Sequence, residues 1–145
     1  MKYKIFPFLF SIVFFMATNT ALAIPNLPRG KAYNYFDGAG NKYVLVRNVL
    51  EYYPIKASES SSGIYDGGTK ISHSLSKKQL KEIELLFQKV IDDKSCQTTK
   101  NIKPNCYLKI ITYETIKSFS IIATNKSNIN LLEKLKQIKE LHKSN

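Results

Sequence analysis

The side chains able to carry out catalysis are few in this chain, and their spacing matches no enzymatic pattern. The histidines are His73 and His142, and neither lies near a serine in a Gly-x-Ser-x-Gly elbow. His73 falls within an alternating segment that predicts a strand. His142 falls at the end of a helical segment, where a cation suits the negative end of the helix dipole. We interpret both histidines as structural.

Two further groups of residues approach a catalytic motif without completing it. The segment Gly63–Lys70 has the glycine spacing of a phosphate-binding loop, but its lysine follows the hydroxyl residue, and a strand is expected next instead of a helix. Asp37 and Asp66 each precede a glycine, which is typical of turns and not of the paired carboxylates that hydrolyse glycosides. The sequence therefore predicts a protein that is not an enzyme and that needs no cofactor.

The two cysteines, Cys96 and Cys106, fit a structural bridge better than a metal site. No histidine stands at ligand spacing from them, so they cannot complete the four ligands of a zinc site, and we expect no metal. An oxidising compartment, which the N-terminal segment indicates, favours their pairing. The sequence predicts one disulfide, which would contribute roughly 2–3 kcal/mol to stability.

The first 23 residues have the three regions of a secretory signal peptide. Lys2 and Lys4 give a positive start, Ile5–Ala17 is almost wholly apolar, and Ala21–Ala23 has the small-x-small cleavage pattern. The apolar run is shorter than the roughly 20 residues needed to cross a bilayer. We expect cleavage after Ala23 and an exported protein, either periplasmic or fully secreted.

The remainder of the chain is the length of one small domain. Residues 24–30 contain two prolines and a glycine and are expected to form a flexible leader. Residues 31–145 are expected to form a single globular domain, because the 145 − 23 = 122 residues left after cleavage suit one domain with a modest core.

The charge of the chain narrows the class of partner. Lysine and arginine number 22 against 11 acidic residues, a formal net charge of +11, which favours anionic partners. The lysines are scattered over predicted helices, and only Arg29 and Arg47 could make forked contacts to phosphate. Because an exported protein rarely meets nucleic acid, we expect no nucleic-acid binding. The partner classes that remain are an acidic protein, an anionic glycan and a membrane surface.

Hydrophobic periodicity predicts an α+β fold. Alternating segments predict strands, and apolar residues at helical spacing predict two amphipathic helices, the first of which begins with a capping box at Ser76 and Gln79. The expected strands are 31–36, 42–53, 69–75, 106–113 and 117–124, and the expected helices run from 77 to about 92 and from a cap at Ser127 or Asn128 to about 142. The order β-β-β-α-β-β-α predicts an antiparallel sheet of about five strands with both helices on one face.

The loop over residues 58–69 is the feature that stands out as a binding surface. It is rich in serine and glycine, yet Ile64 and Tyr65 stand at its tip, between Ser62, Gly63 and Asp66. Tyrosine is favoured at recognition surfaces because it offers a large contact area at low entropic cost. The alternative is that Ile64 and Tyr65 fold back onto the edge of the sheet.

Within this loop, Ser62-Gly63-Ile64-Tyr65 resembles the short Ser-Gly-x-Tyr loop of bacterial periplasmic lysozyme inhibitors. In that family the loop inserts into the cleft of the enzyme, so the resemblance implies inhibition by loop insertion. It covers four residues of the chain. The two predicted helices and the positive charge depart from that mostly β family.

A second possible surface is a tyrosine cluster near the start of the domain. Its members either pack across neighbouring strands or stack on sugar rings of cell-wall glycans. They are Tyr33, Tyr35, Tyr43, Tyr52 and Tyr53.

Together these features predict a small, monomeric, exported binding protein of the cell envelope or exterior. It would act as an inhibitor or immunity-type neutraliser, and it would engage a protein partner through the 58–69 loop. Two alternatives stay open: a small envelope enzyme that uses Asp66, His73 or the tyrosines, and a module that binds a glycan or another anionic polymer.

Overall fold

The computed structural model describes residues 30–60, 62–100 and 105–141. The predicted signal peptide, its cleavage site and His142 lie outside these residues, as does all of the predicted leader except Gly30. Within the described part of the chain, neither α-helix is long and apolar enough to cross a membrane.

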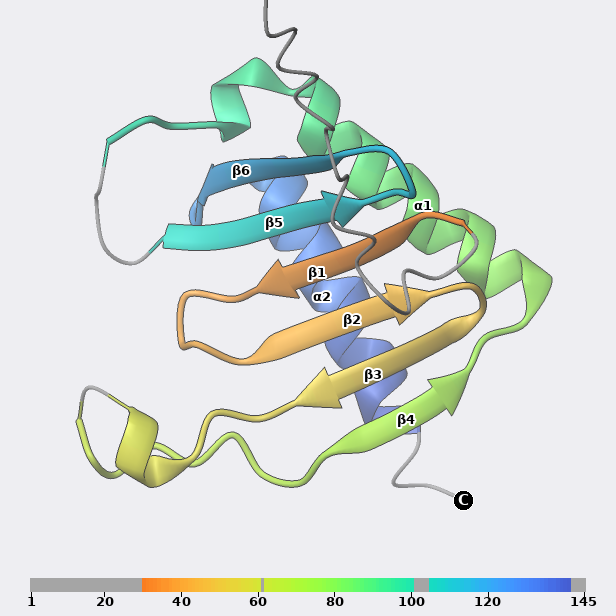
Figure 1. The fold of residues 1–145 in the computed structure, drawn as a ribbon. Coiled ribbons are helices and arrows are strands. Elements are labelled where there is room, and N and C mark those ends of the chain that lie inside the picture. The colour runs from red at the N-terminus through yellow and green to blue at the C-terminus, as the bar shows by residue number, and fades with distance from the viewer. Residues whose placement is uncertain (1–29, 61, 101–104, 142–145) are drawn as a thin grey trace, which may run out of the picture.

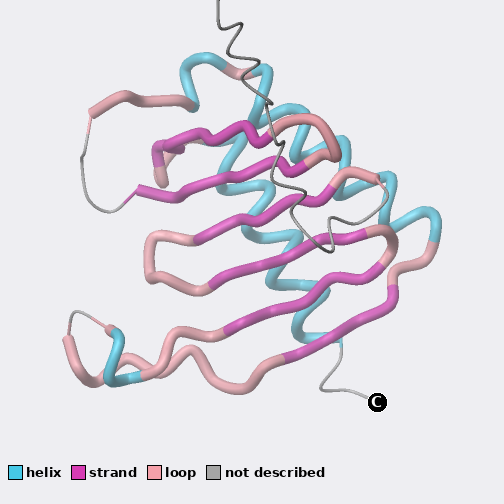
Figure 2. The backbone as a smooth tube through the Cα atoms, viewed as in Figure 1, coloured by secondary structure: helices cyan, strands magenta, loops and turns pink. Residues whose placement is uncertain are grey.

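Six antiparallel strands form one sheet, and two α-helices cover one of its faces (Figure 1). The order of the strands across the sheet is β4-β3-β2-β1-β5-β6, and Figure 2 shows both helices behind it. The strands are β1 (Ala32–Phe36), β2 (Lys42–Val46), β3 (Val49–Tyr53), β4 (Ile71–Ser74), β5 (Asn105–Ile111) and β6 (Ile116–Ile122), and the helices are α1 (Lys77–Asp92) and α2 (Lys126–Leu141). The α+β class and the antiparallel sheet are confirmed, whereas the count of five strands is wrong.

The sixth strand arises because the segment 42–53 is a hairpin and not a single strand. Val46 pairs with Val49, so the turn has only Arg47 and Asn48 at its centre. Arg47 has a φ of 55°, a left-handed conformation that is uncommon for a residue other than glycine. No turn signal such as Asn-Gly marks this position, and the sequence has an alternating, strand-like pattern both before and after it. The sequence therefore predicted one strand.

The two-residue turn also changes which side chains face the helices. Leu45 pairs with Leu50 and Tyr43 with Tyr52, and all four are buried on the helix side of the sheet. A single strand over 42–53 would place Tyr43 and Leu45 on the opposite face from Leu50 and Tyr52. That placement is wrong because a hairpin turn of two residues resets the alternation.

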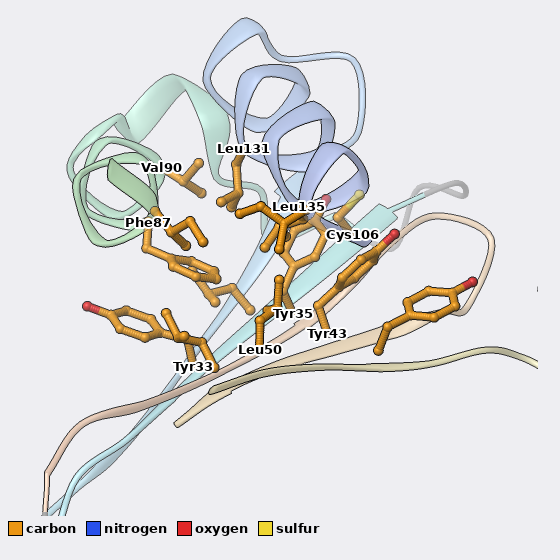
Figure 3. Packing of buried hydrophobic residues seen from close by; sticks show 14 of the residues in the cluster. Tyr33, Tyr35, Tyr43, Leu50, Phe87, Val90, Cys106, Leu131 and Leu135 are labelled. Atoms are coloured by element: carbon orange, nitrogen blue, oxygen red, sulfur yellow. The ribbon is translucent and has the colours of Figure 1, made fainter. Parts of the chain in front are cut away.

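The core lies between the sheet and the two helices (Figure 3). The ring of Tyr33 stacks on the ring of Phe87 from α1, with centroids 4.3 Å apart and planes 10° from parallel. From α2, Leu131 and Leu135 complete the same layer and are fully buried. Burying each such side chain contributes about 1.5–3 kcal/mol, so this layer fixes both helices to one face.

The predicted start of the first helix is confirmed, and the start of the second is corrected. Ser76 Oγ accepts a hydrogen bond from Gln79 N at 3.2 Å, and Gln79 Oε1 accepts one from Ser76 N at 2.9 Å. The second helix is instead capped by Asn125, whose Oδ1 accepts from Ser127 N at 2.8 Å. Ser127 and Asn128 therefore lie inside the first turn of α2.

The predicted disulfide is wrong, because Cys96 and Cys106 are unbonded and buried. Gln97 pairs with one side of Ile121 in β6, and Cys106 pairs with its other side. Strand β6 therefore runs between β5, which carries Cys106, and the segment that carries Cys96. Burial raises the pKa of the Cys96 thiol to about 11. Both thiols therefore act as small apolar core groups.

A buried polar contact joins α2 to the sheet beside Cys106. Asn128, which is fully buried, accepts a hydrogen bond from Tyr35 Oη at 2.9 Å. Its Nδ2 donates to Ala123 O at 3.1 Å and to Cys106 Sγ at 3.4 Å. Satisfying every polar atom avoids the cost of burying an unpaired group and fixes the position of α2 on the sheet.

Candidate functional site

The connection between β3 and β4 projects beyond the end of the sheet (Figure 1). It contains one short 3-10 helix, Ala57–Glu59, and returns to the sheet through Gly67 and Gly68. The residues that the sequence singled out, Ser62 to Asp66, lie within this connection and are all exposed. The structure therefore presents these five residues together.

Asn41, a buried residue of the β1–β2 connection, fixes the base of this loop. Its Nδ2 donates to Asp37 Oδ2 at 2.8 Å and to Tyr65 Oη at 3.0 Å. Its Oδ1 accepts from the backbone N–H of Ile55 at 3.1 Å. A single side chain thus joins the β1–β2 connection to Ile55, just before the 58–69 loop, and to Tyr65 within it.

Tyr52 of β3 completes a polar cluster with Asp37, Asn41 and Tyr65. Its hydroxyl lies 3.0 Å from Asn41 Oδ1 and 2.7 Å from the carbonyl oxygen of Gly67, and its one proton serves one of these two acceptors. Burial, and then the neighbouring hydroxyl of Tyr65, raise the pKa of Tyr52 to about 12. Tyr52 therefore remains a neutral hydrogen-bond donor at any physiological pH.

Gly67 is required where the loop passes over this cluster. A β-carbon at this position would collide with Asn41 Oδ1 and would lie 2.9 Å from both Pro54 Cβ and Tyr52 Oη. No side chain fits that space without displacing the polar cluster. The glycine therefore allows the backbone of the loop to approach Tyr52 and Asn41 closely.

The tip of the loop is held by local hydrogen bonds and leaves an apolar side chain in solvent. Ser62 Oγ accepts from the backbone N–H groups of Ile64 and Tyr65 at 3.4 and 3.3 Å, and Asp66 Oδ1 accepts from Gly68 N at 2.9 Å. Ile64 is 85% exposed and Tyr65 is 43% exposed. Of the two alternatives for this loop, Ile64 does not fold back onto the sheet, whereas the hydroxyl of Tyr65 turns inward to Asn41.

The anchoring residues Asn41, Tyr52 and Gly67 were not identified from the sequence as parts of this site. The turn composition around Asp37 indicated a hairpin but gave no sign that its last residue holds a loop 24 positions away. The Asp-Gly-Gly signal at the end of the loop was the one local hint of a close backbone approach.

Among the other candidate residues, Tyr52 contacts the loop through Gly67, and the rings of Tyr35, Tyr43 and Tyr52 pack on one another across neighbouring strands. His73 lies in β4 opposite Leu50 and is half-buried. Of the tyrosine cluster, Tyr33, Tyr35, Tyr43 and Tyr52 are buried beneath the helices, and Tyr53 faces the other side of the sheet. Across residues 30–60, 62–100 and 105–141, no three His, Cys, Asp or Glu side chains gather closely enough to hold a metal ion.

Comparison of this chain with known proteins gives no match, whether the comparison is with protein-family models, with curated proteins or with solved structures. The chemistry of its own residues therefore carries the functional argument.

Proposed function

We propose that this protein is a small exported binding protein of the cell envelope, of an inhibitor or immunity type, that engages a protein partner through the 58–69 loop. The observation that carries the proposal is the 85% exposure of Ile64 at the tip of a loop whose base is fixed. A large aliphatic side chain in solvent gains free energy when a partner covers it.

The anchored base makes this loop suited to binding. Asn41 bonds to Ile55 just before the loop and to Tyr65 within it, and Tyr52 bonds to Gly67 near its end. Ser62 holds the tip, so less conformational entropy is lost when a partner binds. Cleavage after Ala23 removes Lys2 and Lys4, so the net charge of +11 becomes 11 − 2 = +9, which favours a partner with an acidic surface around its binding cleft.

The resemblance of Ser62-Gly63-Ile64-Tyr65 to the loop of lysozyme inhibitors supports insertion into an enzyme cleft. In this chain the side chain free to enter a cleft is that of Ile64, because the hydroxyl of Tyr65 accepts a hydrogen bond from Asn41. The alternative of an envelope enzyme has less support. Asp66 is bonded to the backbone of its own loop, and His73 lies in β4.

The test replaces Ile64 by serine and compares the variant with a matched control, Leu85→Ser. Leu85 is 55% exposed on α1, so the control makes a similar apolar-to-polar change on another element. The purified wild type and both variants are used to capture proteins from an envelope extract. Affinity for each captured protein, and for a lysozyme of acidic isoelectric point as the first defined candidate, is then measured by calorimetry.

We expect Ile64→Ser to weaken binding about 10- to 100-fold, since burying an isoleucine is worth about 1.5–3 kcal/mol. Leu85→Ser should leave the affinity unchanged. If Ile64→Ser binds the captured partner as tightly as the wild type does, the assignment of the loop is wrong.

A further inference from the structure

The face of the sheet opposite the helices carries a row of aromatic and basic side chains. Lys42 pairs with Tyr53 and with Phe36, and Phe36 pairs with Tyr107, so the four residues lie side by side across β3, β2, β1 and β5. Their neighbours in sequence point into the core, so these four point away from it. Both α-helices lie behind the sheet in Figure 1, so none of residues 30–60, 62–100 and 105–141 places an α-helix over this face.

Lysines are placed over the rings of this row. Lys42 Nζ lies 5.8 Å from the ring centroid of Phe36 and 5.4 Å from that of Tyr53. Lys70 Nζ lies 4.4 Å from the Tyr53 centroid, and Lys109 Nζ lies 5.6 Å from the centroid of its neighbour Tyr107. Each ammonium therefore stands over the ring of a half-buried aromatic side chain.

Positive charge exceeds negative charge on this surface. Glu51, on the same face, accepts a hydrogen bond from Tyr53 Oη at 2.8 Å and lies 3.7 Å from Lys70 Nζ. One carboxylate therefore stands among three lysines, and the surface as a whole attracts anions.

We propose that this outer row, made of Phe36, Lys42, Tyr53, Lys70, Tyr107 and Lys109, binds an acidic polysaccharide. The C–H faces of sugar rings carry slight positive charge and pack on the negative faces of aromatic rings. The carboxylates of an acidic polymer would meet the ammonium groups beside those rings. Strands about 4.8 Å apart repeat these contacts across the sheet, which suits an extended chain of sugar units.

The outer row is independent of the 58–69 loop. Five of its residues lie on strands and Lys70 lies directly before β4, and none of them belongs to the polar cluster around Asn41. Loss of the loop function would leave this proposal standing, and the reverse also holds.

Single-stranded nucleic acid also combines anionic groups with flat rings. The sugar polymer is favoured because the chain has only two arginines and begins with an expected export signal.

The test measures binding of the purified protein to polygalacturonate, with neutral dextran and oligothymidylate as comparison polymers. One variant carries Lys42→Gln, Lys70→Gln and Lys109→Gln. The charge-matched control carries Lys77→Gln, Lys81→Gln and Lys89→Gln, three exposed lysines of α1. A third variant, Phe36→Val with Tyr107→Val, removes two rings but keeps residues that favour strands. Unfolding by urea confirms that each variant is folded.

We expect the wild type to bind polygalacturonate and not dextran, and to bind more weakly as salt rises. The outer-row lysine variant should lose about tenfold or more in affinity, while the α1 variant should lose less than about threefold. The ring variant should also lose about tenfold while keeping the salt dependence. Equal losses in the two lysine variants, no binding to polygalacturonate, or tighter binding to oligothymidylate would each overturn the proposal.

Discussion

Replacing Asn41 by alanine should destabilise the fold far more than its position in a short turn suggests. The residue is 3% exposed, and its side chain takes part in four hydrogen bonds, with Asp37, Tyr65, Ile55 and Tyr52. Alanine removes the donor of two of these bonds and the acceptor of the other two. The loss of stability then depends on which of these partners can form another hydrogen bond.

Two of the four partners keep or gain another hydrogen bond. Tyr52 can donate to the carbonyl oxygen of Gly67, 2.7 Å away, and the half-exposed Tyr65 can bond to water. Asp37 Oδ2 and the backbone N–H of Ile55 lose their Asn41 partner in a partly enclosed site. At roughly 1–3 kcal/mol for each unsatisfied group, we expect a total loss of about 3 kcal/mol.

Urea unfolding followed by circular dichroism measures this loss, with Asn130→Ala as the control. Asn130 is exposed on α2, so its replacement should change stability by no more than about 0.7 kcal/mol. The slope with urea should stay the same in both variants. Combining Asn41→Ala with Tyr65→Phe should show a coupling of about 0.5–1 kcal/mol. A loss below about 1 kcal/mol for Asn41→Ala would refute the claim that this side chain anchors the loop.

Four further predictions concern other parts of the fold. Tyr35→Phe removes the hydroxyl that donates to buried Asn128, and urea unfolding should show a loss of about 1–2 kcal/mol; no loss would mean that this bond is not needed. Arg47→Gly relieves a left-handed backbone and should raise stability in the same assay by about 0.5–1 kcal/mol, whereas a decrease would contradict the turn geometry. Hydrogen bonds, chiefly from the Ser95 side chain, lower the pKa of Asp93 below its ordinary value of 3.8. The ionised carboxylate therefore stabilises the fold above about pH 4. This stabilisation is lost as the pH falls through the lowered pKa. Asp93→Asn should accordingly narrow the difference between urea midpoints at about pH 6 and about pH 3, and an unchanged difference would count against it. Thiol titration without reductant should find Cys96 unreactive in the folded protein, because the thiol is buried and its pKa is raised to about 11. After unfolding, both cysteines should react. Fewer than two reactive thiols in the unfolded protein would contradict the unbonded state.

The sequence alone predicted the features that depend on neighbouring residues. The capping box at Ser76 and the apolar stripe of α1 are set by spacings of three and four positions, and both are confirmed. The serine and glycine content of the 58–69 loop likewise indicated an exposed connection, and Ile64 is exposed at its tip.

Only the tertiary structure decided which residues meet across long separations. The division of 42–53 into β2 and β3 was hidden because Arg47 and Asn48 carry no strong turn signal, and pairing with neighbouring strands imposes the turn. Gln97 and Cys106 pair with Ile121 from opposite sides, so β6 lies between the two cysteine-bearing segments, and the two cysteines that the sequence predicted to bond are unbonded.

The same distinction explains what could be predicted about the two candidate surfaces. A local pattern could indicate the tip of the loop, but its anchor depends on Asn41 reaching Tyr65, 24 positions away. The outer row exists because Phe36, Tyr53 and Tyr107 come from three separate strands placed in register. Periodicity and propensity act over a few residues, whereas strand order and register are fixed by burying the whole core at once. The sequence therefore determined the elements, and the packing of those elements determined which surfaces they form.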